Sequence, residues 1–218
     1  MYYIKNKKIL FRLFLLFLLF LLYIFTSAFF YTKKISNSLE SNIFRLHIIA
    51  NSNNKEDQEV KYIVRNNIID YMNKLCIDTK NKNEVIKTVS DNLENFEKIA
   101  NQTLKENNYP YTATVELGNF EFPSKKYSNV TFPAGFYDAL KIKLGQSAGQ
   151  NWWCVLYPSL CFIDNTATIP KESDEILKEN LSDEEYFIIS NSGNPIYNLK
   201  FKIVELFSNS KFKFPQNI

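Results

Sequence analysis

Four side chains in this 218-residue chain are candidates for a nucleophile or its base: Ser147, Cys154, Cys161 and His47. Ser147 lies at the centre of residues 145–149, which match the G-x-S-x-G turn that presents the serine of α/β-hydrolases. That turn must lead into a helix, whereas residues 150–158 are aromatic, end in proline and favour a strand. The single histidine also precedes the serine, which reverses the hydrolase order. The sequence therefore favours a hairpin loop at residues 145–149, and we expect no catalytic residues.

An exported hydrolase is the alternative, with Cys154 or Ser147 as the nucleophile and His47 as the base. A reactive thiolate needs nearby positive charge, and no cation flanks Cys154 in the sequence. The C-x6-C spacing makes Cys154 and Cys161 a disulfide candidate in an exported chain, against two reduced buried thiols. Closing that loop would contribute roughly 2.5 kcal/mol. One histidine and no C-x-x-C pair argue against a zinc site, so we expect neither metal nor cofactor.

Aromatic and basic residues offer a different chemistry, which is recognition of another protein. Trp152 and Trp153 are adjacent, so on a strand they point to opposite faces. One should pack in the core, and the other either covers a second layer or is exposed as an anchor for a partner. Arg45 and His47 share one face of an earlier predicted strand, where they form either a structural pair or a recognition edge. The candidate partner-binding residues are Arg45, His47, Asn51, Phe132, Trp152 and Trp153.

The spacing of apolar residues predicts the elements that position these side chains. Within residues 43–51, Leu46 and Ile48 share one face, which predicts a strand with that face in the core and a polar opposite face. Apolar residues recur every three or four positions in residues 60–75 and again in residues 83–107. That spacing is typical of two amphipathic helices.

Further alternation predicts strands at residues 111–117, 139–144 and 152–157. Residues 119–135 carry two prolines and are predicted to form a long loop, and residues 145–149 are predicted to join the last two strands as a hairpin. Together these patterns predict an α+β fold. A single domain over residues 43–164 would pack two amphipathic helices on a mostly antiparallel sheet.

Residues 13–25 are apolar without interruption, follow four cations and precede Thr26-Ser27-Ala28. This is the pattern of an export signal, with Ala28 as the candidate cleavage position. The mostly apolar run continues to residue 31, which is long enough to span a bilayer. Residues 1–28 are therefore a signal peptide or a membrane anchor, and we expect membrane contact through residues 1–31. In either case the rest of the chain is predicted to cross the cytoplasmic membrane.

The formal net charge of +3 comes from the amino terminus, because residues 1–28 hold four cations and no acid. The remainder is close to neutral, which gives no electrostatic basis for binding nucleic acid. Residues 165–218 are acidic and weakly patterned, and they either close the same domain or follow it. Within them, the apolar residues between positions 199 and 207 fit a strand or a helix equally well.

Three blocks of the sequence resemble the stage II sporulation protein R family of endospore-forming bacteria. They are RLHIIANSNNKEDQ at residues 45–58, NVTFPAG at residues 129–135 and GQNWWCVLYPSLCF at residues 149–162. The resemblance covers about residues 43–164 and includes the signal-like start. The chain departs from the family where Asn54-Lys55 replaces the Ser-Pro or Asp-Pro that opens a helix, which affects only a helix cap.

The resemblance implies a non-catalytic signalling protein that is made in the forespore and exported into the space between forespore and mother cell. There, soluble or anchored by its amino terminus, it would activate a membrane-embedded aspartic protease of the mother cell. That protease would cleave the precursor of the early mother-cell sigma factor. An exported hydrolase acting on wall or peptide substrates, and a structural protein of the envelope, are the other functions consistent with the sequence.

Overall fold

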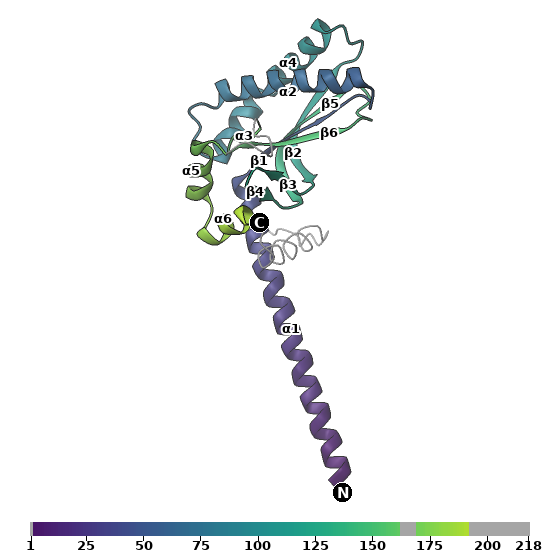
Figure 1. The fold of residues 1–218 in the computed structure, drawn as a ribbon, viewed down its shortest axis with the longest axis vertical. Coiled ribbons are helices and arrows are strands. Elements are labelled where there is room, and N and C mark those ends of the chain that lie inside the picture. The colour runs from purple at the N-terminus through teal and green to yellow at the C-terminus, as the bar shows by residue number, and fades with distance from the viewer. Residues whose placement is uncertain (1, 162–168, 192–218) are drawn as a thin grey trace.

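The structure is a computed structural model that describes residues 2–161 and 169–191. A single long helix projects from a domain in which helices pack on a sheet (Figure 1). The described elements are, in order, α1 (Tyr2–Asn42), β1 (Phe44–Ile49), α2 (Lys55–Leu75), α3 (Lys82–Asp91), α4 (Leu93–Glu106), β2 (Ala113–Phe122), β3 (Lys125–Tyr127), β4 (Val130–Phe132), β5 (Gly135–Leu144), β6 (Asn151–Tyr157), α5 (Lys171–Asn180) and α6 (Asp183–Ser190). The predicted α+β fold class, with its amino-terminal apolar helix, is confirmed.

The main sheet has the strand order β2-β5-β1-β6, in which β1 and β5 are parallel and the other two pairs are antiparallel. The sheet is therefore mostly antiparallel, as predicted. The predicted hairpin between β5 and β6 is wrong, because β1 lies between them. The prediction of one buried and one polar face for β1 is also wrong. As a central strand β1 is covered on both sides, and Arg45 is buried as completely as Leu46.

The loop that joins β5 to β6 runs across the end of β1 and not around a hairpin. The amides of Ala148 and Gly149 donate to the carbonyls of Asn51 and Ala50, at 3.0 and 2.9 Å. A Cβ at Gly149 would lie 2.1 Å from the carbonyl oxygen of Ser52. Gly145 has a φ of +52°, and a Cβ there would lie 2.2 Å from Oδ1 of Asn51. Gly149 is required by the close approach of two backbone segments, and Gly145 by its positive φ and by the side chain of Asn51.

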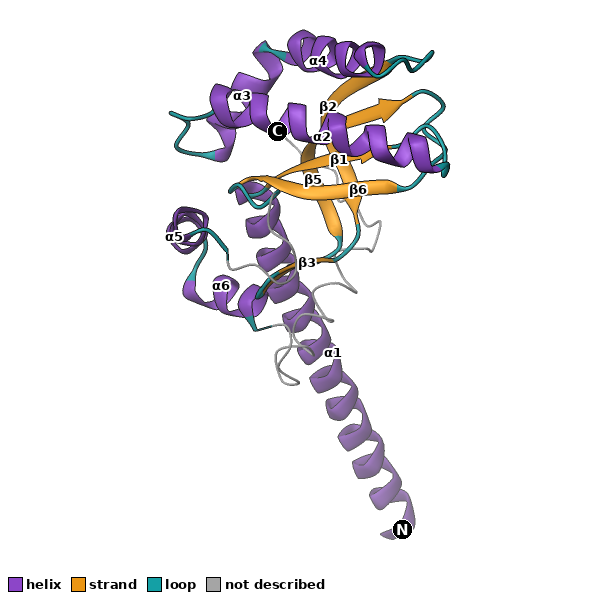
Figure 2. Cartoon of the chain, turned by 45° about the horizontal axis from the view of Figure 1, so that its top comes forward, coloured by secondary structure: helices purple, strands orange, loops and turns teal. Residues whose placement is uncertain are grey.

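Helices α2, α3 and α4 cover one face of the sheet (Figure 2). The predicted α2 stripe is buried at Val60, Val64 and Ile68. The second predicted helix is divided into α3 and α4, because Asn92 ends one and begins the other. The side chain of Asn92 donates to the carbonyl of Thr88 at 2.9 Å, and asparagine side chains that bond to nearby backbone in this way interrupt helices.

The two-stranded sheet of β3 and β4 lies where the long loop was predicted at residues 119–135, so that prediction is wrong. Strand β2 also continues to Phe122. Phe122 and Tyr127, together with Phe132, are buried. The small sheet therefore covers part of the face of the main sheet that the helices leave open, and its formation depends on burying these rings.

Helix α1 has two chemically different halves. Between residues 9 and 25 its apolar side chains are exposed, whereas Ile35 and Leu39 are buried in the domain core. Within the described residues, α1 is the one helix long and apolar enough to cross a membrane, and an export signal has the same features. After residue 168 the chain forms α5 and α6, and a capping box of Ser182 and Glu185 begins α6. The apolar segment at residues 199–207 lies outside the described residues.

Candidate functional site

The face of the main sheet opposite α2, which we call the open face, carries an unusual set of basic and aromatic side chains. Cross-strand neighbours share a face of a sheet, and the register pairs His47 with Lys141 of β5 and with Trp153 of β6. Arg45 lies two residues before His47 and therefore on the same face. We call Arg45, His47 and Lys141 the basic cluster. It extends from the part of the face that β3 and β4 cover to the part that they leave open.

Arg45 is fully buried and is held by aromatic rings. The central carbon of its guanidinium lies 4.3 Å from the ring centroid of Phe122 and 4.9 Å from that of Tyr137. Nη2 is 3.5 Å from the hydroxyl oxygen of Tyr127, at the outer limit of a hydrogen bond, and Nε and Nη1 have no partner. Unpartnered buried donors cost about 1 to 3 kcal/mol each, and more when they are charged. Ring contacts offset only part of that cost.

His47 is 8% exposed and stacks on Trp153, with ring centroids 5.6 Å apart and planes at 21°. Its Nε2 lies 2.7 Å from Oδ1 of Asn151. A carbonyl oxygen accepts hydrogen bonds, so Nε2 carries the proton and Nδ1 is left as an acceptor. Nδ1 is buried and has no partner. Burial lowers the pKa of His47, and Lys141 and Arg45 lower it further, although the bond to Asn151 opposes them.

Lys141 completes the cluster from the half-buried centre of β5. Its ammonium nitrogen lies 4.6 Å from the ring centroid of Phe120. The carboxylate of Glu116 is across the strand from Lys141 but pairs with Lys143 instead. None of the three basic side chains forms an ion pair in the described part of the chain. The buried side-chain nitrogen and oxygen atoms that lack a partner there all belong to Arg45 and His47.

The structure brings together only some of the predicted partner-binding residues. Arg45, His47 and Trp153 share the open face. Phe132 belongs to the small sheet that covers part of this face and is fully buried against Tyr127, with ring centroids 6.0 Å apart. Phe132 therefore cannot contact a partner in this conformation, and Arg45 is not exposed at the surface.

Trp152 and Asn51 lie elsewhere. Trp152 is on the helix-covered face beneath Arg65, whose guanidinium carbon is 5.0 Å from the indole ring. Asn51 has a structural role, because it accepts from the amide of Gln146 and donates to Asp57.

Several residues of this face were not among the sequence candidates. Phe120, Lys141, Asn151 and Tyr127 each contact Arg45, His47 or another member of the face. The alternation of residues 139–144 placed Lys141 on a polar side of its strand, which was the available signal. The pattern did not show that β5 pairs with β1, which is what places Lys141 beside His47.

The geometry does not bring Cys154 and His47 together as a nucleophile and its base. Cys154 and Cys161 form a disulfide, with an S–S distance of 1.98 Å and a Cα–Cα distance of 5.1 Å. Cys154 is opposite Leu46 in the register, so it lies on the other face of the sheet from His47. Nε2 of His47 is occupied by Asn151. Among the described residues there is also no cluster of three metal-binding side chains.

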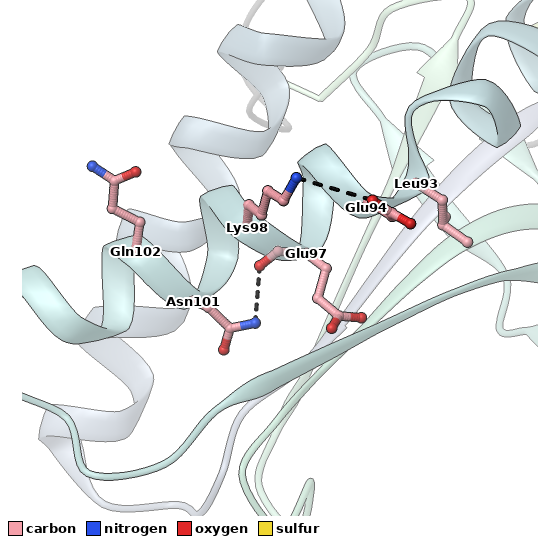
Figure 3. Close-up of a pocket in the computed structure, with 6 residues that line it drawn as sticks. All are labelled: Leu93, Glu94, Glu97, Lys98, Asn101 and Gln102. Carbon is pink, nitrogen blue, oxygen red and sulfur yellow. Dashed lines mark hydrogen bonds and ion pairs between the residues drawn. The ribbon is translucent and has the colours of Figure 1, made fainter.

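A hollow of about 750 Å³ lies along α4, lined by the side chains in Figure 3. Two of them are already used in the fold. Asn101 bonds both backbone groups of Ala113, and Glu97 accepts from the amide of Val115 at 3.3 Å. These bonds satisfy the outer edge of β2. The remaining lining residues lie on the same helix, with Leu93 half-buried and Glu94, Lys98 and Gln102 exposed, so the hollow has the character of a surface groove.

Comparison with known proteins gives two matches. The profile of the family described as stage II sporulation protein R matches residues 40–167. The stage II sporulation protein R of Bacillus subtilis (strain 168) is 33% identical over 133 residues, which are 60% of this chain and 59% of that protein. The chain thus matches less than two thirds of the length of its curated relative. No solved structure matches.

Proposed function

This chain belongs to the stage II sporulation protein R family, and from that premise we propose that it is an exported signalling protein that activates a membrane-embedded aspartic protease. The protease belongs to the mother cell and cleaves the precursor of the early mother-cell sigma factor. The protein acts as a ligand and performs no catalysis itself. It works in the space between forespore and mother cell, either free after cleavage at Ala28 or anchored through residues 1–31.

The observation that carries this proposal is the exposed apolar half of α1. Side chains such as Phe11 and Leu16, 67% and 61% exposed, have no partner surface in the domain, and a bilayer or an export channel is the environment that suits them. The Cys154–Cys161 disulfide supports delivery to an oxidising compartment outside the cytoplasm. Both features support an encounter with a membrane-embedded partner on the outer side of the membrane.

The proposed contact surface is the open sheet face around Trp153, His47 and Lys141. Tryptophan is enriched at protein-binding hot spots, and the basic groups beside Trp153 suit an acidic partner surface. Phe132 and Arg45 are fully buried, so they contribute to this surface by packing and not by exposure. Trp152 lies on the other face of the sheet and Asn51 lies in a loop, so we expect both residues to stabilise the fold and not to contact the partner. No observation favours the hydrolase, because Cys154 is tied in a disulfide.

The deciding experiment is coexpression of the chain with the protease and the sigma precursor in a non-sporulating host. We expect precursor cleavage with the full chain and none with a form that begins after residue 31 and stays in the cytoplasm. A protease lacking its catalytic aspartates provides the control for background cleavage. Equal cleavage with the cytoplasmic form, or none with either form, would contradict the proposed function.

A further inference from the structure

The unsatisfied polar atoms of the described chain coincide at one place. Nε and Nη1 of Arg45 and Nδ1 of His47 are all buried without a partner, and the two residues are neighbours on one face of β1. Buried polar groups are normally hydrogen-bonded, and each exception in a native structure calls for an explanation, of which binding of an ion or other group is one. Arg45 and His47 are residues i and i+2 of one strand, so their Cα atoms are about 7 Å apart. A single small group set between these two side chains is within reach of both.

The charge of the site indicates what that group must be. Two basic side chains, Arg45 and Lys141, flank His47, and both lower the pKa of His47. Glu116, the carboxylate opposite Lys141 in the register, is engaged by Lys143. Like charges brought together without an acid repel one another. An anion bound here would offset this repulsion and accept from the unpartnered N–H groups of Arg45.

The shape of the site favours a carboxylate. The rings of Phe122 and Tyr137 pack against the guanidinium of Arg45. Its N–H groups are therefore the atoms that remain to bind another group. A planar carboxylate matches the planar guanidinium, and its single negative charge suits one buried arginine. On its arrival His47 would take up a proton at Nδ1 and become a second donor. Access runs from the open half of the face, where Lys141 and Trp153 are half-buried.

We propose that Arg45, His47 and Lys141 form a binding site for the carboxylate of an aspartate or glutamate side chain of the protein partner. This inference rests on the proposed function, because it names the chemistry by which that partner is recognised. In the complex the partner carboxylate lies between Arg45 and His47, with Lys141 at the entrance. Trp153 covers the apolar part of the inserted side chain.

The chain has one histidine, so His47 reports on this site without spectral overlap. The full chain, labelled with ¹⁵N-histidine and held in detergent micelles, is titrated with N-acetylglutamate N-methylamide while ¹⁵N chemical shifts are recorded. We expect Nδ1 to become protonated and the pKa of His47 to rise by about 1 or more. The uncharged glutamine analogue should change neither. An unchanged spectrum, or equal responses to the two probes, would overturn the carboxylate site.

Variants test the same site in the coexpression assay. Lys141→Met and Arg45→Met should each reduce precursor cleavage by about 10-fold to 100-fold, the loss expected for a charge-assisted hydrogen bond. Lys98→Met, which removes an exposed cation from α4, should leave cleavage unchanged. Thermal melts identify any variant that fails to fold. Lys141 is half-buried, so Lys141→Met still decides the matter if Arg45→Met does not fold.

The two proposals fail in distinguishable ways. If the wild-type chain processes the precursor and both methionine variants do so equally well, the carboxylate site is wrong while the proposed function stands. If no form of the chain provokes cleavage, the proposed function is wrong. The titration of His47 then still decides whether the site binds a carboxylate, because that measurement needs no protease.

Discussion

The two faces of the main sheet follow different rules. The face under α2, α3 and α4 is built from apolar side chains such as Leu46, Ile48 and Ile142, all fully buried. The opposite face buries Arg45 and His47 with unpartnered nitrogens and leaves aromatic rings half-buried. The first face has the composition of a stabilising core. The second face carries polar groups that folding alone does not explain, which is typical of surfaces selected for binding.

The largest expected effect separates the two faces by stability. Phe96→Ala on α4 should lower the free energy of unfolding by about 3 to 5 kcal/mol, because Phe96 is fully buried and packs edge-on against Tyr71. Phe120→Ala on the half-buried open face should cost less than about 1.5 kcal/mol. Urea denaturation of both variants measures the difference. Equal losses would mean that the open face is as much a part of the core as the helix-covered face.

The adjacent tryptophans test the same division through function. Trp153 stacks on His47 at the open face, whereas Trp152 lies on the helix-covered face beneath Arg65. Trp153→Ala should reduce precursor cleavage by 10-fold or more, as expected for a hot-spot residue worth about 2 kcal/mol. Trp152→Ala should keep cleavage and lose some thermal stability. The division of the faces does not hold if Trp152→Ala stops cleavage while Trp153→Ala leaves it intact.

Much of the fold was predictable because its periodicities are local. The α2 stripe and the alternation of Leu46 and Ile48 are properties of short segments, and they predicted the helix and the strand. The strand order was not predictable. Parallel pairing of β1 with β5 joins segments far apart in the sequence, and no local pattern records it. The β3–β4 sheet was missed for a related reason, since Tyr127 and Phe132 show their role only after the main sheet has formed.

The candidate site was predicted in part for the same reasons. Arg45 and His47 stood out as basic residues in an apolar strand, and Trp153 stood out by type. Lys141 could not be joined to them, because its place beside His47 follows from the register of β1 and β5. The complete burial of Arg45 could not be predicted from the sequence either. It depends on the small sheet that covers one half of the open face.

The smallest expected effect is the response of stability to pH, which would sharpen the difference between the faces. Burial first, and then the neighbouring cations Lys141 and Arg45, hold the pKa of His47 below the value of about 6.5 that it has in an unfolded chain. Asn151 opposes this shift without cancelling it. Below pH 6.5 the unfolded chain therefore binds more protons than the folded one. The contribution of His47 to stability is present above pH 6.5 and is lost as the pH falls through its lower folded pKa.

His47→Gln isolates this contribution, because glutamine is polar and does not titrate. Other groups change stability in the same range; for example, burial raises the pKa of Glu40, which acts in the opposite direction. Subtracting the unfolding free energies of the variant from those of the wild type removes such terms. Between pH 7 and pH 5 the difference should decline, with a slope no steeper than about 1.4 kcal/mol per pH unit, since one proton is involved. A difference that does not vary with pH would show that His47 is as free to ionise in the folded chain as in the unfolded one, and the open face would then lose its distinctive electrostatics.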